Sequence, residues 1–146
     1  MPKYVLDANV YIDAFRNREN AERLKQFLTK HLPLTYFSAV VTMELRTGAL
    51  SRKQAETLEE AVFAPFERRH RIFAPSANAL KEAGRILAAL TEEHLFNLRS
   101  PANSLIRDSL LAASCREHGF VLVTNDTDYQ RIKRHLKEFR YVSPWP

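Results

Sequence analysis

The residues Phe-Val-Leu-Val at positions 120–123 form a continuously apolar run between Gly119 and the polar sequence Thr-Asn-Asp at 124–126. A strand with one face in water alternates apolar and polar residues, so an unbroken run is typical of a parallel strand buried on both faces. Such a sheet needs helices on both of its faces, since parallel strands are joined by crossover helices. This run therefore predicts a three-layer α/β fold with a central, mostly parallel sheet.

Further strand-like and helix-like segments alternate along the chain, and together they predict a single domain over residues 1–146. We expect strands at 4–6, 34–37, 71–73 and, as an edge strand, 139–142, with strands 4–6 and 121–123 as neighbours. Three helices are predicted by their starts, with an N-cap at Asn20, a capping box at Ser51 and Gln54, and a cap at Thr127 and Gln130. An apolar stripe predicts a fourth, formed by Leu80, Ala83, Leu87 and Leu90. Two more helices are expected from Ser38 to Gly48 and, after a loop at Ser100–Pro101, from about Asn103 to His118. Residues 7–9 are expected to form a polar turn.

Composition limits the classes of protein to consider. No apolar run approaches the length of a membrane span, and the N-terminus lacks the apolar segment of a signal peptide, so we expect a cytoplasmic protein. The single cysteine, Cys115, excludes an internal disulfide and a paired-cysteine metal site. The net charge of +5 favours binding to polyanions such as nucleic acid, although this signal is weak by itself.

Four acidic residues stand where polar chemistry is expected. Ligands of parallel sheets bind beyond the carboxyl ends of the strands, and Asp7 and Asp126 follow the strands 4–6 and 121–123. Glu44 and Asp108 share helix faces with apolar residues, where an unpaired carboxylate is costly. Four carboxylates at one rim would repel by about 3 kcal/mol per pair at ~5 Å and an effective dielectric of ~20. A divalent cation relieves this repulsion, and oxygen ligands favour Mg²⁺ or Mn²⁺ over zinc.

Each acid taken singly also has an ordinary structural interpretation. Asp7 and Asp126 are suited to helix caps or turns. Glu44 has Arg46 or a distant lysine as a possible partner, and Asp108 has an arginine at the sheet edge as an alternative. These interpretations do not explain why all four acids fall on the same predicted rim.

Four segments resemble, in order and spacing, the motifs of PIN-domain ribonucleases. They are residues 5–10 (Val-Leu-Asp-Ala-Asn-Val), 42–48 (Thr-Met-Glu-Leu-Arg-Thr-Gly), 108–113 (Asp-Ser-Leu-Leu-Ala-Ala) and 121–129 (Val-Leu-Val-Thr-Asn-Asp-Thr-Asp-Tyr). The length and compact spacing are most similar to the VapC-type toxins of toxin–antitoxin pairs. One departure is Tyr129, where phenylalanine is commoner, and we interpret it as conservative.

The resemblance implies roles for particular residues. Asp7, Glu44, Asp108 and Asp126 would be catalytic ligands of Mg²⁺ or Mn²⁺, directly or through water. Asp128 would be an additional ligand, and the alternative is an acid stabilised in the first turn of the next helix. Asn9 and Thr124 would orient these acids. Arg46 and Arg107 are candidates for binding RNA, and a solvated surface position is equally consistent with each. The resemblance also implies a cognate antitoxin and a homodimer.

The implied reaction is metal-assisted hydrolysis of an RNA phosphodiester. None of the 5 histidines lies in the four motifs, which argues against histidine-based acid–base chemistry. A phosphatase of the haloacid dehalogenase class also begins with strand-Asp-x-Asp, but Asn9 replaces the second aspartate that its mechanism needs. A housekeeping PIN nuclease and a non-catalytic PIN-like module that binds RNA or protein remain as alternatives.

Overall fold

The computed structural model describes residues 1–97, 99 and 104–145, and these contain one five-stranded, all-parallel sheet. The strands are β1 (Tyr4–Leu6), β2 (Thr35–Ser38), β3 (Ile72–Phe73), β4 (Val121–Val123) and β5 (Arg140–Val142), in the order β3-β2-β1-β4-β5. The predicted α/β class and the predicted pairing of the first strand with strand 121–123 are both confirmed. β5 lies at the edge, as expected.

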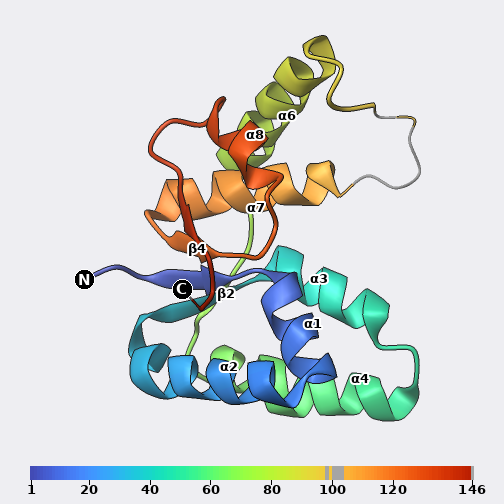
Figure 1. Cartoon of the computed structure of the whole chain (residues 1–146), viewed down its shortest axis with the longest axis vertical. Helices are drawn as coiled ribbons and strands as arrows, with labels where there is room; N and C mark the ends of the chain where they lie inside the picture. The colour runs from blue at the N-terminus through green and yellow to red at the C-terminus, as the bar shows by residue number, and fades with distance from the viewer. Residues whose placement is uncertain (98, 100–103, 146) are drawn as a thin grey trace.

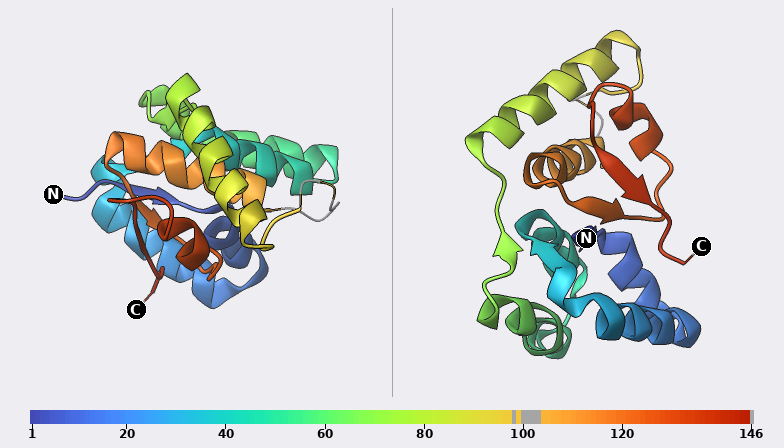
Figure 2. Two further views of the ribbon diagram at one scale, coloured as in Figure 1. Left: turned by 90° about the horizontal axis from the view of Figure 1, so that it is seen from above. Right: turned by 90° about the vertical axis from the view of Figure 1, so that its left-hand side faces the viewer.

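Helices cover both faces of the sheet. The helical segments are α1 (Ala8–Arg16), α2 (Arg18–His31), the short 3₁₀ segment η1 (Leu32–Leu34), α3 (Ala39–Gly48), α4 (Arg52–Leu58), the π-helical segment η2 (Glu59–Phe63), α5 (Ala64–Arg68), α6 (Ala77–Glu92), α7 (Leu105–His118) and α8 (Tyr129–Lys133). On one side of the sheet lie α1, α2 and α4, and on the other side α7 lies between the sheet and α6 (Figures 1 and 2). Among the described residues, no helix is both long and apolar enough to cross a membrane.

The core forms where the inner strands meet these helices. Val5 and Leu6 of β1 and all three residues of β4 are buried, which agrees with the continuous apolar run at 120–123. Helix α7 is buried along most of its length because it lies between the sheet and α6. Gly119 ends α7 with φ 71°, a left-handed conformation that favours glycine, and so turns the chain into β4.

Side-chain caps set the starts of several helices. The Ser38 hydroxyl accepts a hydrogen bond from the Val40 amide at the start of α3, and Ser51 and Gln54 form the predicted capping box of α4. The expected polar turn at 7–9 is wrong, because the Asp7 carboxylate accepts from the Ala8 amide and α1 begins there. Asn9 is therefore a helical residue.

Two further sequence predictions, on the starts and faces of α2 and α6, need correction. Helix α2 is capped by Asn17, whose side chain accepts from the amide of Asn20, so the cap lies three residues before the predicted one. Leu80 is 55% exposed, because the buried stripe of α6 consists of Ala79, Ala83, Ile86 and Leu90.

The helix predicted from about Asn103 begins at Leu105 in the described part of the chain, and Asn103 and the loop at Ser100–Pro101 lie outside it. Helix α8 begins at Tyr129 without a side-chain cap, so the predicted cap at Thr127 is also wrong.

Candidate metal centre

The carboxyl ends of β1 and β4 bring several polar side chains to one edge of the sheet. The Asp7 amide, just after β1, donates to the Val123 carbonyl at the end of β4, with nitrogen and oxygen 2.9 Å apart. Thr124 and Asp126 follow β4 directly. Asp7 and Asp126 therefore lie at the same edge, as parallel pairing requires.

Asp7 is buried, and both of its carboxylate oxygens accept hydrogen bonds. Oδ1 accepts from the Ala8 amide at 2.8 Å. Oδ2 accepts from the Thr124 hydroxyl at 2.8 Å and from the Tyr129 hydroxyl at 3.1 Å. Burial raises the pKa of Asp7, while these hydrogen bonds oppose that rise and the charge of Asp126 adds to it. The carboxylate is thus held in a fixed orientation by three different elements.

Thr124 and Asn9 link this carboxylate to the loop after β4. The Thr124 hydroxyl donates to Asp7 and accepts from the Asn9 side-chain amide at 3.2 Å and from the Asp126 backbone amide at 3.0 Å. The Asn9 side-chain oxygen in turn accepts from the Asn125 amide at 3.1 Å. The hydroxyl hydrogen and both lone pairs of Thr124 are therefore used, which fixes the loop that carries Asp126 against α1.

Asp108, in the first turn of α7, is the least compensated carboxyl group of the site. The residue is 5% exposed. Its Oδ1 lies 3.3 Å from the Tyr129 hydroxyl, and its buried Oδ2 has no hydrogen-bond partner among the described residues. Burial raises the pKa of Asp108 to about 8, and the charges of Asp7, Asp126 and Glu44 add to this rise. A buried oxygen without a donor is costly unless a cation or water meets it.

Asp126 and Asp128 bring two further carboxylates close to Asp108. Oxygens of these three side chains, one from each residue, all lie within 4.8 Å of one another. The Asp126 Oδ1 accepts from the Asp128 backbone amide at 2.8 Å, which fixes the turn before α8. Both aspartates are half-buried, so this group opens towards solvent on one side.

Glu44 lies on α3 at the margin of this group. Its side chain is 18% exposed, and an Oε1 lies 3.8 Å from Nε of Arg107. Burial raises the pKa of Glu44, Arg107 opposes the rise, and Asp7 and Asp126 add to it. The charges of Asp7 and Asp126 therefore act on Glu44, although it is not one of the three carboxylates whose oxygens lie within 4.8 Å of one another.

The chemistry of these groups fits a hard divalent cation. Mg²⁺ and Mn²⁺ prefer oxygen ligands, and the three clustered carboxylates are of this kind. The unpartnered Asp108 Oδ2 and the raised pKa of Asp108 are the marks of a carboxyl group that lacks a compensating positive charge.

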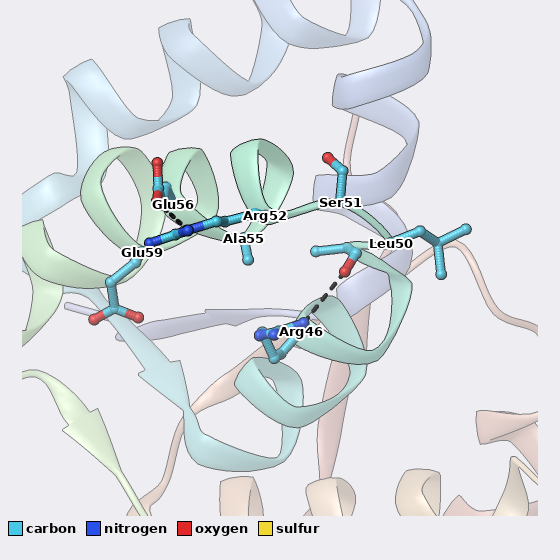
Figure 3. A pocket seen from close by; sticks show the side chains of 8 residues that line it. Arg46, Leu50, Ser51, Arg52, Ala55, Glu56 and Glu59 are labelled. Carbon is cyan, nitrogen blue, oxygen red and sulfur yellow. Dashed lines mark hydrogen bonds and ion pairs between the residues drawn. The ribbon is translucent and has the colours of Figure 1, made fainter.

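The two arginines considered for RNA binding differ in position. Arg107 faces Glu44 at the acidic edge. The Arg46 guanidinium instead donates to the Ala49 carbonyl at 3.2 Å and lines a surface pocket with residues of α4, including Arg52 and Glu56 (Figure 3). Within the described part of the chain, Arg46 makes no hydrogen bond or ion pair with the acids of the site.

Two residues at the site have contacts that the sequence does not predict, Tyr129 with two of the acids and Asn125 with α1. Tyr129 was treated as a conservative replacement, yet its hydroxyl reaches both Asp7 and Asp108. The Asn125 side chain donates to Asp13 Oδ2 at 2.7 Å, which adds a second link between the β4 loop and α1. The departure from phenylalanine at position 129 was the available signal for the first.

The family model of the PIN domain matches residues 4–135, and the chain therefore belongs to the PIN domain family. A search of curated proteins gave no match.

Solved structures with the same fold come from bacterial VapBC and FitAB complexes. A chain of DNA-bound VapBC from Salmonella typhimurium is 24% identical, with 99% of each chain covered and a TM-score of 0.70. A chain of FitAcB from Neisseria gonorrhoeae is 22% identical, with 97% of this chain and 98% of that chain covered and a TM-score of 0.68. A chain of the toxin–antitoxin complex from Klebsiella pneumoniae is 22% identical, with 98% of each chain covered and a TM-score of 0.64. At these identities the likeness concerns the fold.

The raised pKa of Asp108 predicts a specific dependence of stability on pH. Between its ordinary pKa of 3.8 and the folded value of about 8, the unfolded chain loses this proton while the folded chain keeps it. Rising pH therefore destabilises the folded state across this window, and the cost is complete above pH 8. Asp108→Asn has no such proton, so in EDTA it should gain more than about 1.4 kcal/mol relative to wild type between pH 5 and pH 8, since one pKa unit has that value.

Urea unfolding at the two pH values, at fixed ionic strength, measures this difference. If a base in the fold compensates Asp108, the asparagine variant will instead lose stability relative to wild type at pH 8, and the assignment of an uncompensated carboxyl group is then wrong.

Proposed function

We propose that the chain is a divalent-metal-dependent endoribonuclease that hydrolyses RNA phosphodiesters. The observation that carries the proposal is the buried Oδ2 of Asp108, which has no hydrogen-bond partner among the described residues and belongs to a carboxyl group that clusters with those of Asp126 and Asp128. A purely structural acidic cluster would be expected to pair such an oxygen with a base or a backbone donor. Membership of the PIN domain family supports the same reading.

In this proposal the acids have graded roles. Asp108, Asp126 and Asp128 hold Mg²⁺ or Mn²⁺, and Asp7 and Glu44 complete the site directly or through water. Bound metal supplies a water of lowered pKa and neutralises negative charge at the phosphate. Thr124 and Asn9 hold Asp7 and the loop of Asp126 in place through the hydrogen bonds described above.

Arginine side chains at the rim are suited to the substrate backbone. The Arg107 side chain is 40% exposed and its Nε lies 3.8 Å from Oε1 of Glu44, so its guanidinium can contact a phosphate while remaining near the acids. Nη1 of Arg131 lies 4.0 Å from Oδ1 of Asp128. Together with the net charge of +5, these residues favour a polyanionic substrate despite the acidic centre.

We further propose that the nuclease is the toxin of a toxin–antitoxin pair, active in the cytoplasm and assembled as a homodimer. The similar solved structures are VapBC, FitAB and other toxin–antitoxin complexes. An apolar groove of about 560 Å³, lined by residues such as Ile12, Phe15, Leu45 and Val62, adjoins Glu44. An antitoxin segment with apolar side chains and a basic residue for Glu44 fits this groove and would block the acidic site.

Cleavage of RNA should depend on divalent metal and on the acids of the site. Purified protein should cleave RNA with Mg²⁺ or Mn²⁺, and EDTA should stop the reaction. Asp7→Asn and Asp108→Asn keep the side-chain shape but remove charge, so each should slow cleavage by about 100-fold or more, beyond the usual effect of losing an outer-shell partner. Glu56→Gln is the matched control, because Glu56 is an exposed acid paired with Arg52 on α4 and should leave the rate unchanged.

Gel analysis of a labelled RNA measures these rates, and circular dichroism checks the fold of each variant. Wild-type cleavage rates in either aspartate variant, or full activity in EDTA, would show that the acids do not form the metal centre.

Expression of the active nuclease should affect bacterial growth. Induced expression of the chain alone should arrest bacterial growth, whereas Asp108→Asn at equal protein level should not. Co-expression of a small protein encoded beside the gene should restore growth, because it would occupy the groove and the acidic site. Growth curves and colony counts measure the effect. Unimpaired growth with a demonstrably active nuclease would instead favour a housekeeping PIN nuclease.

A further inference from the structure

Tyr129 begins α8 directly after Asp128, and its ring is fully buried. The ring packs against Phe139 and Tyr141, with centroids 6.0 and 6.1 Å away. An aromatic ring with only two side-chain torsions, held by this packing, presents its hydroxyl at a fixed point. An aromatic ring without a hydroxyl would fill this buried position as well. The hydroxyl is therefore the feature that needs an explanation.

That hydroxyl lies between two acids from different elements. It is 3.1 Å from Asp7 Oδ2, after β1, and 3.3 Å from Asp108 Oδ1, on α7. Asp7 has other donors in the Ala8 amide and the Thr124 hydroxyl. For the carboxyl group of Asp108, Tyr129 is the one hydrogen-bond partner within residues 1–97, 99 and 104–145.

We propose that Tyr129 is a positioning residue of the metal centre, whose hydroxyl holds Asp108 Oδ1 so that Oδ2 remains available as a metal ligand. The inference rests on the proposed function, since it concerns the same site. Without the hydroxyl, the Asp108 side chain would be free to rotate away from the charges of Asp7 and Asp126. Metal binding would then have to order it again, which lowers affinity.

Another buried tyrosine offers a matched control. Tyr11, on α1, packs against Phe37, and its hydroxyl has no hydrogen-bond partner among the described residues. Tyr11→Phe and Tyr129→Phe remove the same buried group from the same kind of ring. They differ in that one hydroxyl contacts acids and the other does not.

The test is isothermal titration calorimetry of Mn²⁺ binding to wild type, Tyr129→Phe and Tyr11→Phe, with thermal melts in EDTA to follow the fold. We expect Tyr129→Phe to raise the Kd for Mn²⁺ by about tenfold or more, the range for loss of a group that orients a ligand. Tyr11→Phe should leave the Kd unchanged. A purely structural role of the Tyr129 hydroxyl would change the melting temperature without changing the Kd.

The outcomes separate this inference from the proposed function. If Tyr129→Phe binds Mn²⁺ as tightly as wild type, the positioning role is wrong, while the metal-dependent function stands. If wild type binds no Mn²⁺, both are wrong. If the two tyrosine variants weaken binding equally, the effect comes from the core and the positioning role is again overturned.

Discussion

Parallel pairing of β1 with β4 is the constraint on which the site depends, because it brings the ends of two buried strands, and the acids that follow them, to one edge of the sheet. Helix α7, packed between the sheet and α6, adds Asp108, which contacts the same Tyr129 hydroxyl as Asp7. The fold thus brings negatively charged side chains together at a partly buried site. There the carboxylates repel one another, and burial opposes their ionisation. The chain must compensate these charges or leave them for a ligand to compensate.

The carboxylates of the site are compensated to different degrees, and this difference supports the proposed metal-dependent function. Asp7 receives hydrogen bonds on both oxygens, and Glu44 faces Arg107. Asp108 has only the Tyr129 hydroxyl on one oxygen and no partner for the other within the described residues. A buried oxygen without a partner lowers the free energy of unfolding of the metal-free protein. A cation that binds this oxygen would remove that cost, and the difference would contribute to its binding free energy.

The sequence predicted the placement of the acids to the extent that it depends on strand ends and helix periodicity. The apolar run at 120–123 predicted a buried parallel strand, so the positions of Asp7 and Asp126 followed from topology. Asp108 was recognisable because a charge among apolar residues at helical spacing must face the core.

The sequence did not predict features that depend on the exact rotation of a helix about its axis or on the direction in which a side chain points. A shift of one residue, about 100° around α6, exposes Leu80 and buries Ala79. Arg46 turns to the carbonyl of Ala49, and the hydroxyl of Tyr129 reaches two acids across the fold.

X-ray diffraction of Mn²⁺-soaked crystals, with data at the manganese absorption edge, tests the metal centre most directly. The account predicts an anomalous peak among the carboxylates of Asp108, Asp126 and Asp128. Saturating Mn²⁺ with no peak there, or with peaks only at other acids, would contradict it.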